Sequence, residues 1–535
     1  MRKGVTSTFI ILIIITSFIH LSNSFSSSRR TTTTLAQRGI HYYYYYYYFV
    51  SPNIVSWNKY YSIRVPRRSY SSTSVITMMT TPNNNSLECT VARSTGLATF
   101  LKSNTDMMKV GFHPKQEQLQ QPKFKIIMGN EAGDADSILS AITLAYVESL
   151  PNNPNGSHGG DQRLLPIASI VRQDISLRND VNLLLHMVGI DKDHDLMYLD
   201  DDIFQTIVHD HNIKKSVVLV DHNKIRSDLW HLEGYVEEIL DHHQDEGAHS
   251  DSVHDDLRDI AFEDNSATVG STCTLIVERL MLYVQDDKKN IHDSVDTERM
   301  VDPGLGLALL GVILLDTMNM SEHAGKGTIR DQTAIDFLMD HVAWDSLNLE
   351  ETIRSKIFSS SSDNEGGWIP NRERLFAMLQ DSKFDPDFWQ RMTARDALRI
   401  DYKRFETSPP KKNAFGLSSV LLSMEDLTSK PNFAQAAVSY MEEASINLLG
   451  VLTMVIQNDK PVRELLLIGD RDIVHNMTSY LMDNENASIL DIKGSNDTTS
   501  QLETMDKDII MMRLKQGNPK GSRKQVAPIM LSYYF

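Results

Sequence analysis

Four short segments of the chain carry carboxylates directly after apolar runs. They are Gly129–Ser137, Val220–Asn223, Asp241–His243 and Leu315–Thr317. Carboxylate oxygens and imidazole nitrogens are ligands for divalent cations, and two such cations held together can activate a water molecule for attack on phosphorus. The residue types therefore point to metal-assisted hydrolysis of a phosphoester or phosphoanhydride.

Each segment alone also has a plain structural interpretation. Asp134 and Asp136 could be a helix cap and a surface acid, and Asp221 could be a turn former. A single histidine is more often structural than a ligand, but His242 and His243 are adjacent and follow an acid. Because the pattern occurs four times, we interpret the set as one metal site.

The elements that must position these residues are strands alternating with helices. Strands are predicted at Phe124–Met128, Leu165–Val171, Ser216–Val220 and Glu238–Leu240. Asp136 or Ser137 could cap a helix after the first strand, and a further helix is predicted from Arg178 to Gly189. This alternation is typical of a parallel α/β sheet, where ligands bind beyond the carboxyl ends of the strands.

The fourth segment, like the other three, is predicted to follow the end of a buried strand. The apolar run Gly311–Leu315 precedes Asp316. We therefore expect Asp316 at a strand end as well, beside the other acids.

The bulk composition excludes some classes of protein. The chain has 535 residues, 41% of them hydrophobic, which suits two or three domains with sizeable cores. The net charge of −17 argues against a general nucleic-acid-binding protein, although a local basic region can still attract a polyanion. Cys89 and Cys273 are the two cysteines, so a disulfide framework is excluded and a cysteine-based zinc site is not expected.

The N-terminal region resembles a targeting presequence. The basic segment Met1–Lys3, which holds Arg2 and Lys3, precedes an apolar stretch, Phe9–Ile19, and a Ser-, Thr- and Arg-rich stretch follows from Ser26 to Arg38. This order predicts a plastid or a secretory route, with no stable membrane association once the presequence is removed. If the start codon is misassigned, the chain is expected to be cytoplasmic.

Four regions are predicted along the chain. Residues 1–93 are the presequence and a low-complexity segment, 94–358 a metal-binding catalytic domain, 359–371 a Ser- and Gly-containing linker, and 372–535 a second α/β domain. Val420–Leu422 and Leu465–Ile468 are expected to be strands of the second domain.

The order of the motifs resembles the DHH phosphoesterase superfamily with its C-terminal DHHA2 domain. The N-terminal motifs correspond to Asn130, Asp134, Asp136, Asp221, Asp241–His243 and Asp316. The C-terminal motifs correspond to Asp401–Phe405 and Ser522–Val526. The resemblance covers residues 94–535 and implies a smaller C-terminal domain, with the active site in the cleft between the two domains.

One position separates branches of this superfamily. Manganese-dependent pyrophosphatases carry histidine where this chain has Asn130, whereas exopolyphosphatases and prune-type proteins carry asparagine. The segment Leu314–Met320, with Gly325–Thr328 and Asp331 behind it, is also similar to the exopolyphosphatase and prune branch.

The resemblance assigns a role to each motif residue. Asp221 would bridge two divalent cations, Mg²⁺ or Mn²⁺. Asp134, with Asn130, would complete one site, and the other would hold Asp136, His242 and Asp316. Asp241 would orient His242, and His243 would hydrogen-bond the bridging oxygen or protonate the leaving phosphate. The predicted substrate-binding cations are Lys403, Arg523, Lys524, Lys326 and Arg178, of which Arg178 could instead only pair with Asp180.

The predicted activity is exopolyphosphatase, which releases orthophosphate from the ends of inorganic polyphosphate. Hydrolysis of pyrophosphate or short polyphosphates is an alternative, and a cyclic-nucleotide phosphodiesterase is a weaker one. In another class, a prune-like regulatory protein would use the site weakly and act through partners. No nucleic-acid partner is expected, and the oligomeric state stays open.

Overall fold

The computed structural model describes residues 95–111, 123–151, 162–264, 266–290, 300–360, 368–406, 413–457, 460–501, 508–519 and 521–534. The predicted presequence and Cys89 lie outside these ranges. Residues 84–453 and 464–535 belong to one compact unit, and all the residues of the candidate site lie within it. None of the described helices is long and apolar enough to cross a lipid bilayer.

The N-terminal half is built on a six-stranded parallel sheet of order β3-β2-β1-β4-β5-β6. In that order the strands are Met197–Tyr198, Gln162–Ala168, Lys123–Met128, Lys215–Val220, Val236–Asp241 and Arg258–Ile260. The prediction of a parallel α/β sheet is therefore confirmed. The predicted strands at 124–128, 165–171, 216–220 and 238–240 correspond to β1, β2, β4 and β5.

Both faces of this sheet are buried, as the near-continuous apolar strands predict. In β4, Val218 and Val220 enter one core while Val217 and Leu219 enter another, because successive side chains of a strand point to opposite faces.

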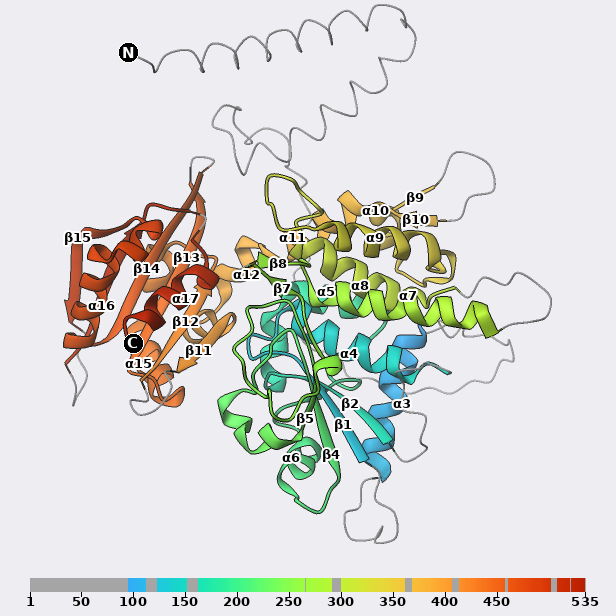
Figure 1. The fold of residues 1–535 in the computed structure, drawn as a ribbon. Coiled ribbons are helices and arrows are strands. Elements are labelled where there is room, and N and C mark those ends of the chain that lie inside the picture. The colour runs from blue at the N-terminus through green and yellow to red at the C-terminus, as the bar shows by residue number, and fades with distance from the viewer. Residues whose placement is uncertain are drawn as a thin grey trace, which may run out of the picture. The chain divides into compact units, whose positions relative to one another are not determined.

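Helices cover the two faces (Figure 1). The helices of the N-terminal half are α3 (Gly96–Gly111), α4 (Ala135–Ser149), α5 (Asn179–Val188), α6 (Asp202–His209), α7 (Thr272–Asn290), α8 (Pro303–Asp316), α9 (Ile329–His341) and α10 (Glu351–Ile357). Buried residues of α4, α5, α7 and α8 share one core, and those of α6 lie in the core on the opposite face.

Asp316 does not follow a strand. It is the last residue of α8, whose first 13 residues are all buried, so the expectation of a strand end was wrong. A segment that is apolar on all sides cannot be assigned to helix or strand from periodicity alone. Asp302 caps this helix by accepting a hydrogen bond from Leu305 N at 2.9 Å, and Pro303 occupies its first turn. Asp followed by Pro at the start of the apolar run was the available helix signal.

The helix after β1 begins two residues earlier than expected. Its N-cap is Asp134, which accepts a hydrogen bond from Ser137 N at 3.0 Å. Asp136 and Ser137, the predicted caps, lie inside its first turn. The predicted helix from Arg178 to Gly189 corresponds to α5, which ends at Gly189 in the left-handed conformation.

The C-terminal half contains a second six-stranded sheet of order β11-β12-β13-β14-β16-β15. In that order the strands are Tyr402–Glu406, Ala414–Val420, Leu448–Gln457, Lys460–Asp470, Ile509–Gln516 and Ile492–Gln501. β11 is antiparallel to β12, which is parallel to β13. The helices of this half are α12 (Pro386–Arg391), α13 (Ala394–Arg399), α14 (Met424–Thr428), α15 (Phe433–Glu443), α16 (Arg471–Asp483) and α17 (Arg523–Ser532). The predicted strand at 465–468 lies in β14, whereas the one at 420–422 overlaps only the last residue of β12.

The region of the predicted linker has some regular structure. Its described ends belong to β9 (Phe358–Ser360) and β10 (Trp368–Pro370), which pair antiparallel. The following helix, α11 (Arg372–Lys383), buries Leu375 and Leu379 in the core of the N-terminal half. The domain boundaries stay predictions, but the apolar face of this helix packs into the core of the first half, and its last residue, Lys383, accepts a hydrogen bond from Trp389 Nε1 of α12 at 3.1 Å.

Candidate active site

The segments after β1, β4 and β5 bring their side chains together at the carboxyl edge of the first sheet. Asp221 Oδ1 lies 3.5 Å from His242 Nε2 and 3.6 Å from His243 Nδ1. Asp136 Oδ2 lies 3.7 Å from the same His242 nitrogen. Asp221, His242 and His243 each offer an atom to a group whose members all lie within 4.8 Å of one another. This arrangement could hold a divalent cation.

Asp221 lies at the centre of these contacts. It follows β4 immediately and has a φ of 61°, a left-handed conformation that Asp and Asn tolerate better than most residues. Burial, and then the charges of Asp136 and Asp134, raise the pKa of Asp221 well above its ordinary value. A buried, crowded carboxylate of this kind is stabilised when a cation neutralises it.

Asn130 lies beside Asp221 and contacts it directly. Its Nδ2 donates to Asp221 Oδ2 at 2.6 Å and to Asp221 O at 3.1 Å. Its Oδ1 accepts a hydrogen bond from Ala132 N at 2.8 Å. The amide therefore orients the Asp221 carboxylate, and both of its polar atoms have partners.

The two acids of the first segment lie in different environments. Asp134 is exposed, whereas Asp136 is buried. Loss of surrounding solvent would raise the pKa of Asp134, but Lys383 and Lys403 hold that pKa below its ordinary value. Asp136 accepts hydrogen bonds from the start of α7, including one from Thr272 N at 2.8 Å.

Asp241 contacts the ring of His243 and not the ring of His242. Asp241 Oδ1 lies 2.8 Å from His243 Nδ1, and Oδ2 accepts from Asn223 Nδ2 at 2.6 Å. Burial alone would raise the pKa of Asp241, but His243, His242 and Asn223 hold it below its ordinary value. The structure differs from the prediction that Asp241 orients the His242 ring, because the contact of Asp241 with His242 is to its backbone N–H, which donates to Asp241 Oδ1 at 2.7 Å.

A backbone carbonyl orients the other histidine. His242 Nδ1 donates to Val269 O at 3.2 Å, which leaves Nε2 as the nitrogen that faces Asp136 and Asp221. The rings of His242 and His243 pack edge to face with centroids 4.6 Å apart. Burial is the main reason that the pKa of His243 falls to about 3.

Asp316 reaches the cluster from the end of α8. Burial, and then the charges of Asp136 and Asp134, raise the pKa of Asp316 well above its ordinary value. Its Oδ2 is buried and has no hydrogen-bond partner. A buried carboxylate oxygen without a partner is costly, so this atom is available to a cation.

Cationic side chains of later segments act on the same carboxylates. Lys403 lies in β11, and its charge influences the pKa of Asp134, Asp221 and His243. Arg523 begins α17 and pairs with Asp401 at 2.7 Å.

Lys383 was not found from the sequence. It ends α11 and pairs with Asp180 Oδ2 at 3.3 Å. Burial would lower the pKa of Lys383, but Asp180, Asp316 and Asp134 raise it above its ordinary value. No motif marks this residue, and a lysine in the last turn of a helix looks like an ordinary dipole partner.

Arg178 is buried and faces backbone carbonyls. Its guanidinium donates to Ala132 O at 2.6 Å, to Asp174 O at 2.7 Å and to Ile400 O at 3.2 Å, and it also bonds Gly133 O. In this structure the side chain braces the loop between Asn130 and Asp134. Arg178 was predicted either to contact substrate or to pair with Asp180. The hydrogen bonds to backbone carbonyls match neither of these roles.

The two remaining predicted substrate-binding lysines are exposed. Lys524 lies in the first turn of α17, and Lys326 lies in the loop between α8 and α9. The structure places neither of them among the buried carboxylates.

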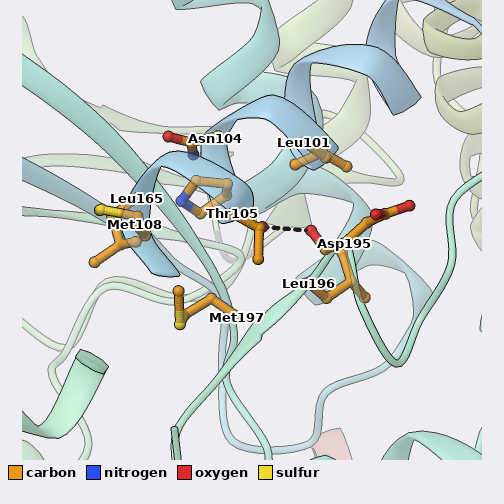
Figure 2. A pocket seen from close by; sticks show the side chains of 9 residues that line it. Leu101, Asn104, Thr105, Met108, Leu165, Asp195, Leu196 and Met197 are labelled. Carbon is orange, nitrogen blue, oxygen red and sulfur yellow. Dashed lines mark hydrogen bonds between the residues drawn. The ribbon is translucent and has the colours of Figure 1, made fainter. Parts of the chain in front are cut away.

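A small hollow elsewhere in the N-terminal half has a different character. Figure 2 shows its lining from α3, β2 and β3, with Thr105 Oγ1 donating to Asp195 O at 2.9 Å. The lining is mainly apolar and includes none of the residues of the candidate site. It offers no cluster of ligands or cations.

Comparisons with known proteins agree with this arrangement. The model of the DHH family N-terminal domain matches residues 125–312, and that of the DHHA2 domain matches residues 379–533. The chain is 23% identical over 414 residues to "Exopolyphosphatase PRUNE1" of Homo sapiens, covering 77% of this chain and 76% of that protein. It is 26% identical over 413 residues to "Putative exopolyphosphatase" of Schizosaccharomyces pombe, covering 77% and 91%.

A solved structure described as a "Methanococcus jannaschii putative family II inorganic pyrophosphatase" matches with a TM-score of 0.44 and 16% identity. The match covers 77% of this chain and 100% of the chain in the solved structure. Because both domain models match in order and relatives named exopolyphosphatase match 77% of the chain, the chain belongs to the DHH superfamily with a DHHA2 domain, in its exopolyphosphatase and prune branch.

Proposed function

We propose that this protein is a divalent-cation-dependent exopolyphosphatase, which hydrolyses the terminal phosphoanhydride bond of inorganic polyphosphate and releases orthophosphate. The observation that best supports this proposal is that Asp136, Asp221 and Asp316 lie close to His242. Asp316 Oδ2 is buried there and has no hydrogen-bond partner. Related proteins carry the name exopolyphosphatase. The donor set of carboxylates and imidazole fits Mg²⁺ or Mn²⁺.

The ligands we propose are Asp134, Asp136, Asp221, His242 and Asp316. Bound cations would supply charge neutralisation and a water of lowered pKa. Asn130 holds the Asp221 carboxylate through its amide. It is better described as a residue that orients a ligand than as a ligand itself.

His243 is the residue we propose for proton transfer. Its Nδ1 donates to Asp241 and burial lowers its pKa to about 3, so Nε2 carries no proton in the free protein and would gain the one it transfers only when the polyanionic substrate is bound. Lys403, Arg523 and Lys383 would neutralise the charge that develops on the transferred phosphoryl group.

Phosphate release tests the proposal. We would incubate the full-length protein with long-chain polyphosphate, tripolyphosphate and pyrophosphate, and separately with cyclic AMP, for which AMP formation is measured, each with Mg²⁺ or Mn²⁺. Steady release from long-chain polyphosphate that stops on chelation is the expected result. Release only from pyrophosphate would support the pyrophosphatase alternative. A folded protein that releases no phosphate from any polyphosphate would contradict the proposal, with AMP formation favouring a phosphodiesterase and the absence of both products favouring a regulatory protein.

The matched control is Asp221→Asn. Asparagine tolerates the left-handed backbone at this position, so the variant should fold and yet lose activity. Wild-type activity in this variant would exclude Asp221 from the site.

The route of the protein in the cell is a separate proposal. The N-terminal composition supports delivery to a plastid or to the secretory pathway. Fusion of residues 1–93 to a fluorescent reporter tests it, and diffuse cytoplasmic fluorescence would contradict it.

A further inference from the structure

A buried carboxylate outside the proposed ligand set lies near two of its members. Asp331 is the third residue of α9 and is fully buried, with 0% of its surface exposed. It accepts hydrogen bonds from Gly270 N at 2.9 Å, from Thr274 Oγ1 at 2.6 Å and from Thr328 N at 2.7 Å. Thr328 Oγ1 also donates to it at 2.8 Å. Asp331 thus joins the start of α9 to the turn that begins α7.

That turn is the part of the chain that holds Asp136. Ser271 Oγ donates to Asp136 Oδ1 at 2.8 Å, Thr272 N donates to Oδ2 at 2.8 Å, and Cys273 N donates to Oδ1 at 3.1 Å. Asp331 binds the residues on either side of these donors, Gly270 and Thr274. The orientation of the Asp136 carboxylate therefore depends on a turn that Asp331 fastens at both ends.

The same turn packs against the residue that follows Asp316. A Cβ atom on Gly270 would lie 2.7 Å from Thr317 Cγ2 and 3.0 Å from Lys326 O, so only glycine allows this approach. Thr328, which caps α9 together with Asp331, ends the loop that starts after Asp316. Asp331 therefore fixes both the turn that binds Asp136 and the end of the loop that follows Asp316.

We propose that Asp331 is a positioning residue for the metal site, acting through the Gly270–Thr274 turn on Asp136 and through Thr328 on the loop after Asp316. This inference rests on the proposed function. Asp331 does not touch substrate or cation. Asparagine in its place would turn an NH₂ group toward N–H donors, which disrupts the acceptor pattern while the side-chain volume is kept.

Mn²⁺ binding to the full-length protein tests this role, measured by the loss of the free-ion electron paramagnetic resonance signal. We expect Asp331→Asn to weaken Mn²⁺ binding by about 10-fold, the lower end of the loss seen when a direct partner of a metal ligand is removed, because Asp331 acts on Asp136 only through the turn. At saturating Mn²⁺, the kcat of Asp331→Asn should be close to that of the wild type, although the variant binds Mn²⁺ more weakly. A general loss of folded protein would instead lower kcat at every Mn²⁺ concentration.

The matched control is Asp302→Asn. Asp302 also caps a helix and also bridges two segments, accepting from Leu305 N at 2.9 Å and Gly96 N at 2.6 Å, but it touches none of the donors that hold Asp136. Its variant should lower the melting temperature and leave Mn²⁺ affinity unchanged. Equal weakening of Mn²⁺ binding in both variants, or wild-type binding in Asp331→Asn, would overturn the inference.

Two further variants separate the possible failures. If Asp136→Asn binds Mn²⁺ like the wild type, the proposed metal site is wrong. If Asp136→Asn loses binding and Asp331→Asn does not, only the positioning role is wrong. Should Asp331→Asn not fold, Thr274→Val removes one hydrogen bond and keeps the shape, with an expected fall in Mn²⁺ affinity of about fivefold. Unchanged affinity in that folded variant would overturn the role.

Discussion

Asn130 Nδ2 donates a hydrogen bond of 2.6 Å to Asp221 Oδ2. The two residues are 91 positions apart in the chain, and they meet because β1 and β4 are neighbours in the sheet. The bond fixes a carboxylate that we propose as a cation ligand.

Asn130→Ala removes this donor, and we expect kcat for polyphosphate hydrolysis to fall by about 10- to 100-fold. Asn130→His replaces the donor with an imidazole and should increase activity with Mn²⁺ relative to Mg²⁺. Phosphate release with each metal measures both effects. Asn104→Ala, which loses a hydrogen bond to Leu164 O at 2.8 Å, is the control. Full activity in Asn130→Ala would show that Asp221 does not need this bond.

Alanine substitutions of the adjacent residues His242 and His243 should affect different quantities, Mn²⁺ affinity and kcat respectively. His242→Ala removes the nitrogen that faces Asp136 and Asp221, so Mn²⁺ affinity should fall. His243→Ala leaves that nitrogen in place and should lower kcat by about 10²- to 10⁴-fold through loss of proton transfer. Calorimetric Mn²⁺ titration and phosphate release distinguish them. A large loss of metal affinity in His243→Ala, with His242→Ala unaffected, would reverse the two roles.

A buried charge network should control acid stability. Lys125 Nζ lies 2.7 Å from Glu148 and 3.0 Å from Glu238, and Glu238 also pairs with Arg279. Lys125→Met leaves Glu148 buried and unpaired, which should cost about 3 kcal/mol of unfolding free energy at pH 7. The exposed pair of Lys123 and Glu237 provides the control, because Lys123→Met should change stability by less than about 1 kcal/mol.

The contribution of Glu238 to the pH dependence of stability has a defined sign. Burial would raise the pKa of Glu238, but Arg279 and Lys125 hold it below its ordinary value. Its contribution is thus present above the ordinary glutamate pKa and is lost as the pH falls through the lower, folded-state pKa. In Lys125→Met the carboxyls can protonate, so the loss of stability should be smaller at pH 5 than at pH 7. Urea unfolding at both pH values checks this, and an equal loss at both would contradict it.

Two serine-to-glycine changes at α15 should have opposite effects. Ser445 follows the helix in a left-handed conformation with a φ of 51°, and Ile446 N donates to Met441 O at 3.0 Å. Ser445→Gly should raise the unfolding free energy by about 1 kcal/mol, because glycine adopts this conformation without strain. Ser439→Gly, inside the same helix, should lower it by a similar amount. Chemical denaturation measures both, and effects of the same sign would refute the explanation.

Several features could be predicted from the sequence because they depend on local patterns. The strands β1, β4 and β5 follow from short apolar runs that end in polar residues, and Asp134, Asp221 and Asp241 follow from their positions at those ends. Alternation of strands and helices also indicates the parallel sheet, which brings these ends to one edge. The apolar run before Asp316 did not reveal its helix, because a fully buried helix and a buried strand share the same composition.

The sequence by itself determined which residue types stand at the ends of the strands, and hence the chemistry available to the protein. Only the tertiary structure decided which atoms they meet: Asp241 holds His243, Arg178 holds backbone carbonyls, and Lys383 joins the acids. The reason is that a hydrogen bond or ion pair depends on distances of a few ångströms between segments far apart in the chain. Those distances are set by packing of whole strands and helices, and not by the local sequence around any one residue.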